Sequence, residues 1–248
     1  METAEFIRVL DREGRSLAAA AAQAGPDAKV PTCPEWRVRD LLLHTGAVHR
    51  WATSFVAERS TSFVPLGDPP DLDGEPLLAW FREGHLRLVD TLSQASPDVA
   101  CWQFLPAPSP LAFWARRQAH ETAVHRVDAE AAGGRDPEEA ARDLDAAFAA
   151  DGIDELLRGF HARDKSRVRT EEPAVLRVRA TDRADAVWTV RLSAEPPVTE
   201  RGAEGAADCE VSGPAGALYL SLWNRLPLPA VSGDDSPAAL WREKSGVN

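Results

Sequence analysis

The sequence predicts an α+β protein, with four helices in its N-terminal part and a smaller C-terminal part that combines helices with strands. Apolar residues recur every three or four positions through most of residues 2–132, which is the spacing of amphipathic helices. Strict alternation of apolar and polar residues, which is typical of strands, appears only in the last third of the chain. Because Gly133 and Gly134 end the last long helical pattern, we expect one domain over residues 1–134 and a second over residues 135–248.

Four helices are predicted in the N-terminal part, separated by segments rich in proline and glycine. Gly25 and Pro26 stop the first helix, and Pro76 suits the first turn of the third, where an amide donor is not needed. Residues 60–76 and 97–110 form long loops, a class of segment that often carries function. The predicted helices span residues 2–24, Val38–Glu58, Pro76–Ala95 and Leu111–Ala132, and residues 30–36 form a loop before the second one.

The C-terminal part begins with helices and continues with strands. We expect a fifth helix from Asp136 to about Ala150, because Pro137 suits a first helical turn, and a sixth that runs to about Arg163. Two alternating stretches rich in valine indicate a β-hairpin that turns near residues 181–185. The other predicted elements are strands over Val175–Ala180, Ala186–Leu192 and Ala207–Val211, a helix from about Ser212 to Arg225, and a partly irregular tail after Pro227.

The composition argues against several classes of protein. A net charge of −11 leaves no basic surplus for neutralising phosphates, so we expect no nucleic-acid partner. No apolar run reaches the roughly 18 residues of a membrane span, and the first 20 residues do not have the pattern of a signal peptide. Three cysteines without CxxC pairing match no disulfide or zinc framework and indicate a reducing compartment. We therefore predict a cytoplasmic protein that binds no membrane.

Two histidine-bearing helical segments indicate a metal site. Glu121 and His125 are four residues apart, which places them one turn apart on the same face of the fourth helix. An imidazole from the second helix, for which we choose His44, completes a set of two histidines and one carboxylate. Four-helix bundles build metal sites from inward-facing side chains of different helices, and a catalytic site leaves one position open for water or substrate. The pattern therefore predicts a metalloenzyme.

Helical geometry also selects among the histidines. His120 lies about 140° around the helix from His125, so these two cannot bind one metal together. His44 follows the apolar stripe that begins at Leu41, whereas His49 does not, and we therefore place His44 at the site. The remaining histidines are interpreted as structural or surface residues; they are His49, His85, His120 and His161.

Ordinary structural roles are alternatives for the same residues. Glu121 can pair with Arg117 at the i,i+4 spacing on the surface, and His44 and His125 can be core histidines with one hydrogen bond each. Asp128, one turn beyond His125, can accept a hydrogen bond from a ligand imidazole, but we favour a solvated acid near the end of the helix. Spacing alone does not decide between these alternatives and the metal site.

Three stretches of the chain resemble the mycothiol-dependent maleylpyruvate isomerase family, which belongs to the DinB-like metalloenzymes. They are CPEWRVRDLLLH at Cys33–His44, HRWA at His49–Ala52 and HETAVHRVDAE at His120–Glu130. The segment CEVSGPAGALYLSLWNR at Cys209–Arg225 is similar to the closing segment of the family. The resemblance therefore extends over most of the chain.

The resemblance implies a DinB-like four-helix bundle for the first predicted domain and a small α+β fold for the second. It implies a divalent metal, usually zinc, bound by His44, Glu121 and His125, with mycothiol as the thiol cofactor. Mycothiol occurs in actinobacteria, and the 25 arginines against 3 lysines of this chain agree with a GC-rich genome of that kind. Arg225 occupies a position where the family has an arginine thought to face the active site, which implies a catalytic role.

The implied reaction uses a thiol that the metal deprotonates near neutral pH. The thiolate attacks a small electrophilic substrate; collapse of the adduct after bond rotation gives isomerisation of the maleylpyruvate type, and retention of the adduct gives S-conjugation. Two alternatives come from other classes. One is a non-catalytic metal-binding or regulatory module on the same fold. The other is a non-haem iron oxygenase, which we disfavour because its ligands usually lie on a β-barrel.

Overall fold

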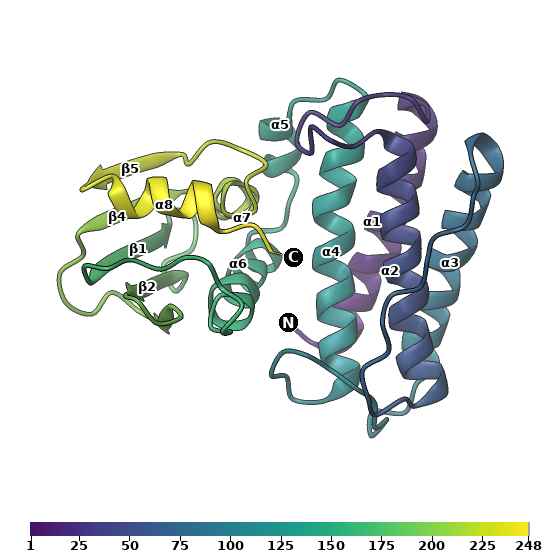
Figure 1. Cartoon of the computed structure of the whole chain (residues 1–248), viewed down its shortest axis with the longest axis horizontal. Helices are drawn as coiled ribbons and strands as arrows, with labels where there is room; N and C mark the ends of the chain where they lie inside the picture. Colours follow the sequence, from purple (N-terminus) through teal and green to yellow (C-terminus); the bar gives the residue numbers. More distant parts are fainter. Residues whose placement is uncertain (248) are drawn as a thin grey trace. The chain divides into compact units, whose positions relative to one another are not determined.

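The computed structural model describes residues 1–247, and the chain forms two compact units, Met1–Pro137 and Glu138–Asn248. Figure 1 colours the first unit from purple to teal and the second from teal through green to yellow. The first unit is helical and the second combines helices with a sheet, so the predicted α+β class is confirmed. Within the described residues, no helix is both long and apolar enough to cross a membrane.

Four helices form a bundle in the first unit, as predicted (Figure 1). They are α1, Thr3–Ala24; α2, Val38–Glu58; α3, Gly74–Gln94; and α4, Pro110–Ala132. The Asp73 side chain accepts a hydrogen bond from the Gly74 amide, so α3 begins two residues earlier than predicted. Ser109 caps α4 by accepting a hydrogen bond from the Ala112 amide, with a proline in the first turn. Side-chain caps therefore set these two helix starts.

Helix α4 is buried on nearly all sides. Its Trp114 stacks on Phe55 of α2 with ring centroids 5.3 Å apart, and both side chains are fully buried. The burial extends to charged residues of α4, because Arg117, Arg126 and Asp128 are each at most 5% exposed. A buried charge is costly unless it is paired and hydrogen-bonded. Helix α4 therefore carries a set of buried polar contacts, and these hold the candidate site described below.

The second unit contains a five-stranded mixed sheet. Its strands are β1, Ala174–Ala180; β2, Val187–Leu192; β3, Val198–Arg201; β4, Cys209–Gly213; and β5, Ala230–Gly233. The strand order is β3-β2-β1-β4-β5, in which β1 pairs antiparallel with β2 as the predicted hairpin and parallel with β4. Strand β4 lies two residues later than predicted. The edge strands β3 and β5 are not predicted, because both are mostly exposed and lack the apolar alternation of a half-buried strand.

The remaining helices differ from prediction in several places. They are α5, Pro137–Arg142; α6, Ala146–Asp154; a π-helix, η1, Glu155–Phe160; α7, Ala215–Leu222; and α8, Ser236–Lys244. The prediction of one continuous helix to Ala150 is wrong, because Asp145 accepts a hydrogen bond from the Phe148 amide and begins a new helix. The tail after Pro227 contains more regular structure than predicted. Its helix α8 buries Trp241, whose indole donates to a backbone carbonyl at 3.0 Å.

Candidate metal centre

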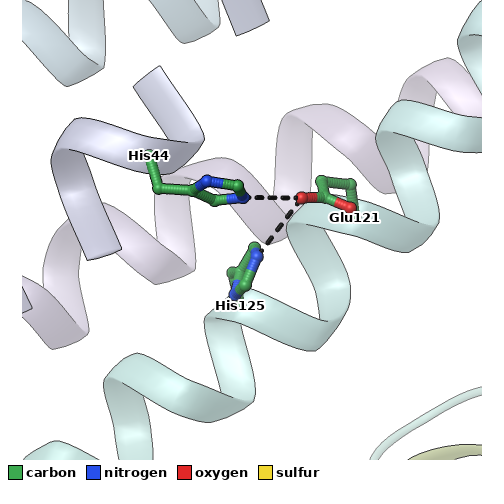
Figure 2. A group of neighbouring side chains, drawn as sticks. All are labelled: His44, Glu121 and His125. Atoms are coloured by element: carbon green, nitrogen blue, oxygen red, sulfur yellow. Dashed lines mark hydrogen bonds and ion pairs between the residues drawn. The ribbon is translucent and has the colours of Figure 1, made fainter. Parts of the chain in front are cut away.

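Helices α2 and α4 bring together the three residues that the sequence predicts for a metal site. His44 Nε2 lies 3.1 Å from Glu121 Oε1, and His125 Nε2 lies 3.2 Å from the same oxygen (Figure 2). The candidate ligand atoms of the three residues all lie within 4.8 Å of one another. The four-residue spacing on α4 and the choice of His44 over His49 thus select side chains that are neighbours in space.

The donor set suits a small divalent cation. Two ligands that each lie about 2.0–2.1 Å from a tetrahedral Zn²⁺ are about 3.3 Å apart, close to the separations of 3.1 and 3.2 Å found here. Two imidazole nitrogens and one carboxylate oxygen occupy three positions, which leaves a further position for water or substrate. The side chains of His44 and Glu121 are 34% and 21% exposed, so the cluster is accessible rather than enclosed in the core.

The carboxylate of Glu121 binds both histidines of the candidate site and also a neighbouring arginine. Its Oε1 faces both histidines, while its Oε2 accepts a hydrogen bond from Arg117 Nη2 at 3.2 Å. Arg117 is 3% exposed, so the pair that we considered as a surface ion pair does form, but with a buried guanidinium. Burial acts to raise the pKa of Glu121. The hydrogen bonds from His125 and His44 and the charge of Arg117 outweigh it, and the pKa lies well below its usual range. The carboxylate is therefore ionised, as a metal ligand must be.

The second ring nitrogen of His125 is held by Asp128, one turn further along α4. Asp128 Oδ2 accepts a hydrogen bond from His125 Nδ1 at 2.8 Å, and the Asp128 side chain is fully buried. Our preferred interpretation of Asp128 as a solvated acid is therefore wrong, and the acceptor role is the one found. Burial acts to lower the pKa of His125, but its hydrogen bonds to Asp128 and Glu121 outweigh burial and raise the pKa to about 9. A metal that binds Nε2 therefore has to displace a proton.

The loop between α1 and α2 supplies contacts that the sequence does not assign to the site. Thr32 Oγ1 donates a hydrogen bond to Asp128 Oδ1 at 2.6 Å. The ring centroid of Trp36 lies 4.9 Å from that of His44 and 5.8 Å from that of His125. Trp36 lies within the first stretch that resembles the known family, and this is the signal that could have pointed to it.

The other histidines are buried and lie outside the cluster. His49 Nε2 shares a 2.9 Å hydrogen bond with Thr122 Oγ1, and its ring centroid lies 5.5 Å from that of His85. His120 packs edge-on against Phe6, with centroids 5.8 Å apart. Four histidines are each at most 3% exposed, namely His49, His85, His120 and His161. This burial agrees with a structural role and excludes a place on the surface.

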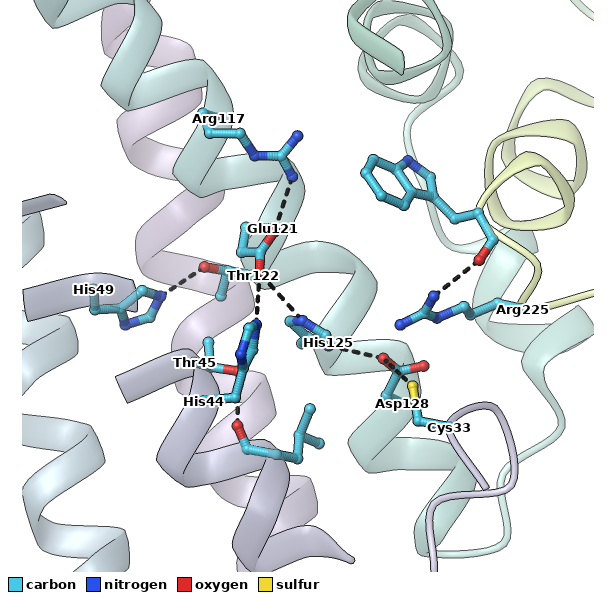
Figure 3. A network of polar contacts seen from close by, with 12 residues as sticks. Cys33, His44, Thr45, His49, Arg117, Glu121, Thr122, His125, Asp128 and Arg225 are labelled. Atoms are coloured by element: carbon cyan, nitrogen blue, oxygen red, sulfur yellow. Dashed lines mark hydrogen bonds and ion pairs between the residues drawn. The ribbon is translucent and has the colours of Figure 1, made fainter. Parts of the chain in front are cut away.

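Arg225 lies in the second unit, shortly after the end of α7. Asn224 has a φ of 61°, a left-handed conformation that turns the chain just before Arg225. The Arg225 amide donates to the Leu220 carbonyl at 2.8 Å, and its Nη1 donates to the Trp223 carbonyl at 2.9 Å (Figure 3). The first of these contacts holds the backbone of Arg225 against the end of α7, and the second is a contact of its guanidinium.

Two protein-family models match the chain. The model described as the mycothiol maleylpyruvate isomerase N-terminal domain matches residues 7–130, and the model described as the MDMPI C-terminal domain matches residues 147–241. The first match contains the three residues of the candidate metal centre, and the second contains Arg225. No curated protein matched the chain by sequence.

Two solved structures have a similar fold. A crystal structure of a mycothiol-dependent maleylpyruvate isomerase that carries a histidine-to-alanine mutation has a TM-score of 0.63 and 12% identity, and the match covers 93% of this chain and 97% of that one. A crystal structure of the mycothiol-dependent maleylpyruvate isomerase without that mutation has a TM-score of 0.55 and 15% identity, with the same coverage. At this identity the two structures establish the fold, whereas the N-terminal family model, which spans half of the chain, establishes the family. By these matches the chain belongs to the mycothiol maleylpyruvate isomerase family and is an enzyme of that family.

Proposed function

We propose that this protein is a metal- and mycothiol-dependent enzyme that activates the thiol of mycothiol for isomerisation of a small electrophile of the maleylpyruvate type, or for its S-conjugation. The observation that carries the proposal is the meeting of His44, Glu121 and His125 in a chain of this family. The names of both solved relatives favour isomerisation. A thiol cofactor also suits the reducing, cytoplasmic location that the cysteine usage predicts.

His44 Nε2, Glu121 Oε1 and His125 Nε2 would hold the metal, which we take to be zinc. A bound zinc ion supplies positive charge that lowers the pKa of a coordinated thiol, so that the thiolate is available near neutral pH. Among the described residues the cluster offers three ligands, and the chain thereby leaves one tetrahedral position for the thiol.

Side chains around the three candidate ligands prepare them for this role. Arg117 binds Glu121 Oε2 at 3.2 Å, which leaves Oε1 to face the histidines. Asp128 binds His125 Nδ1 at 2.8 Å, which directs Nε2 toward the cluster. The indole of Trp36 lies against the histidine rings and reduces the access of water to them. The chain itself therefore sets the charge, the orientation and the solvation of the donors.

We assign to Arg225 the binding of a carboxylate on the substrate. A guanidinium presents its donors in one plane and can bind a carboxylate through two parallel hydrogen bonds. A maleylpyruvate-type substrate carries carboxylates of this kind. The support for this assignment is the similarity of the Cys209–Arg225 segment to the closing segment of the family, and the match of the C-terminal family model over this region.

Metal analysis and an activity assay test the proposal. Protein purified without chelators is expected to contain about one zinc per chain, as a single three-ligand site requires. It is expected to isomerise maleylpyruvate when mycothiol is present. The His125→Ala variant should lose both zinc and activity. The matched control is His49→Ala, which removes an imidazole from the same pair of helices and should retain zinc.

The outcomes separate the alternatives. Formation of an S-conjugate without isomer would assign conjugation rather than isomerisation to the activated thiol. A wild-type protein that contains no zinc, takes none up when zinc is added, and has no mycothiol-dependent turnover would overturn the proposal. That result would favour a non-catalytic module on the same fold. Circular dichroism confirms that each variant is folded before its metal content is compared.

A further inference from the structure

A single buried carboxylate joins the candidate metal centre to the α1–α2 loop, residues 25–37. Asp128 Oδ2 accepts a hydrogen bond from His125 Nδ1 at 2.8 Å, and Asp128 Oδ1 accepts one from the Thr32 hydroxyl at 2.6 Å. Cys33 Sγ lies 3.6 Å from Oδ2, within reach of a weak S–H···O hydrogen bond. Figure 3 shows His125, Asp128 and Cys33 linked in this order.

The chemistry of these groups determines which one donates. A carboxylate only accepts hydrogen bonds, so the hydroxyl, the thiol and the ring Nδ1 each donate to Asp128. The Nδ1 of His125 therefore carries a proton, and Nε2 is the nitrogen that faces Glu121. Because Asp128 is fully buried, water does not readily replace a partner that is lost.

The same loop carries the indole that lies against the site. Trp36 stacks on His125 at an interplanar angle of 28°, with centroids 5.8 Å apart, and its centroid lies 4.9 Å from that of His44. Thr32 and Asp128 are 96 residues apart in sequence, so their hydrogen bond is a long-range tie between this loop and α4. One carboxylate therefore contributes to the position of the imidazole and of the indole.

We propose that Asp128 is a positioning residue with two linked tasks. It sets the tautomer of His125 for metal binding, and through Thr32 it clamps the α1–α2 loop against the metal centre. This inference rests on the proposed metal-dependent function. Since both tasks use the same carboxylate, the bound metal and the docked loop stabilise each other, and the effect of one on the other is reciprocal.

Two variants separate the two tasks. Asp128→Asn keeps the size of the side chain but removes its charge, and the amide that it introduces can donate to Nδ1 and favour the wrong tautomer. Thr32→Val removes the hydroxyl that ties the loop and leaves the carboxylate in place. Thr53→Val is the matched control, because buried Thr53 donates to the His49 carbonyl of its own helix at 2.8 Å.

Zinc affinity is the first measurement, made by competition with a chromophoric chelator. Affinity is expected to fall about 10- to 100-fold in Asp128→Asn, as for other partners of metal-bound histidines. It is expected to fall about 3- to 10-fold in Thr32→Val, which loses one hydrogen bond to a buried charge, and to stay unchanged in Thr53→Val. The visible absorption bands of cobalt-substituted protein report ligand geometry, and they should shift in Asp128→Asn. A role in folding alone would not shift them.

Amide hydrogen exchange over residues 30–36 distinguishes this inference from the proposed function, because it is measured on metal-free protein. Exchange is expected to be faster in Asp128→Asn and in Thr32→Val than in wild-type protein or Thr53→Val. If wild-type protein takes up no zinc, the proposed function fails, while the exchange rates still test the clamp. Wild-type zinc affinity in Asp128→Asn would overturn the tautomer task, and unchanged exchange in both variants would overturn the clamp.

Discussion

Two clusters of side chains join α2 to α4, and they differ in the partners of their histidines. The candidate metal centre consists of His44, Glu121 and His125, and the interior cluster consists of His49, Thr122 and His85. The two histidines of α2 are five residues apart, and their two partners on α4, Glu121 and Thr122, are adjacent in sequence. One step along α4, from Glu121 to Thr122, turns the side chain by about 100°, away from the metal centre and toward the interior cluster (Figure 3).

The partners of the imidazoles account for the difference. His125 has two carboxylate partners, and its pKa rises to about 9 in spite of burial. His49 has a hydroxyl partner, and burial, followed by the neighbouring His85, holds its pKa well below the usual range. Across residues 1–247, neither Nδ1 of His49 nor Nδ1 of His85 has a hydrogen-bond partner. Buried His49, whose partner is a hydroxyl, therefore stays neutral, whereas His125, with its two carboxylate partners, can exchange a proton for a cation.

The largest expected effect comes from removing the carboxylate that distinguishes the two groups. Glu121→Gln keeps the size of the side chain but removes the charge that both histidines share, so we expect loss of stoichiometric zinc binding and of activity. Thr122→Val changes the adjacent residue, which shares no ligand, and should keep zinc affinity within about twofold. Calorimetric titration with zinc measures both variants. Equal affinity in Glu121→Gln and wild-type protein would show that this carboxylate is not a ligand.

The interior cluster is expected to make the metal-free protein sensitive to acid. Burial is the main cause that lowers the pKa of both His49 and His85, so the folded protein binds fewer protons there than the unfolded chain. Histidines of the unfolded chain titrate at about pH 6.5. The stability that the two neutral histidines contribute to the fold is therefore fully present above about pH 6.5 and is lost as the pH falls. For two histidines, the slope of the free energy of unfolding against pH is at most about 2.7 kcal/mol per pH unit.

Urea unfolding at a series of pH values from neutral to mildly acidic measures this slope. His85→Gln removes one of the two buried imidazoles and should reduce the slope by about half, because each histidine contributes at most one proton. A variant with the wild-type slope would assign the acid sensitivity to other groups.

Bound zinc is expected to stabilise the fold through the metal centre and not through the interior cluster. Free zinc at 100 times its dissociation constant should add about 2.7 kcal/mol to the free energy of unfolding, and a chelator should remove this gain. Thr122→Val should show the full gain and His125→Ala none. Thermal unfolding with and without zinc provides the measurement, and an equal gain in His125→Ala would place the stabilising metal elsewhere.

The smallest expected effect concerns the hydroxyl of the interior cluster. Thr122→Val leaves Nε2 of buried His49 without its 2.9 Å hydrogen bond, which should lower the free energy of unfolding by about 1–2 kcal/mol. Chemical denaturation of metal-free protein measures this loss. A variant as stable as wild-type protein would mean that the hydrogen bond contributes nothing net to the fold.

The helix bundle and the residues of the metal centre could be predicted because the sequence patterns that indicate them lie within single helices. Helix α2 begins and ends where its helical pattern does, and Glu121 and His125 reveal a shared face through their spacing alone. Asp128 could not be predicted correctly in the same way. Its burial follows from the packing of α4 on nearly all sides, and its partner Thr32 is 96 residues away in the chain.

The C-terminal part was less predictable for related reasons. Strands β1 and β2 are mostly buried and carry the apolar and β-branched residues that indicate strands, whereas β3 and β5 are exposed edge strands that pair with β2 and β4. Exposed valines in these edge strands, Val198 at 58% and Val231 at 42%, give no pattern that marks a strand. The break before α6 depends on one capping residue, Asp145, within a run of helix-favouring alanines.

X-ray absorption at the zinc edge, recorded on zinc-loaded protein before and after addition of mycothiol, tests the central claim most directly. Before addition we predict nitrogen and oxygen donors alone, as His44, Glu121 and His125 provide. After addition we predict one sulfur at about 2.3 Å from the zinc. Sulfur present before addition would mean that a cysteine of this chain binds the metal, and no sulfur after addition would contradict activation of the thiol at this site.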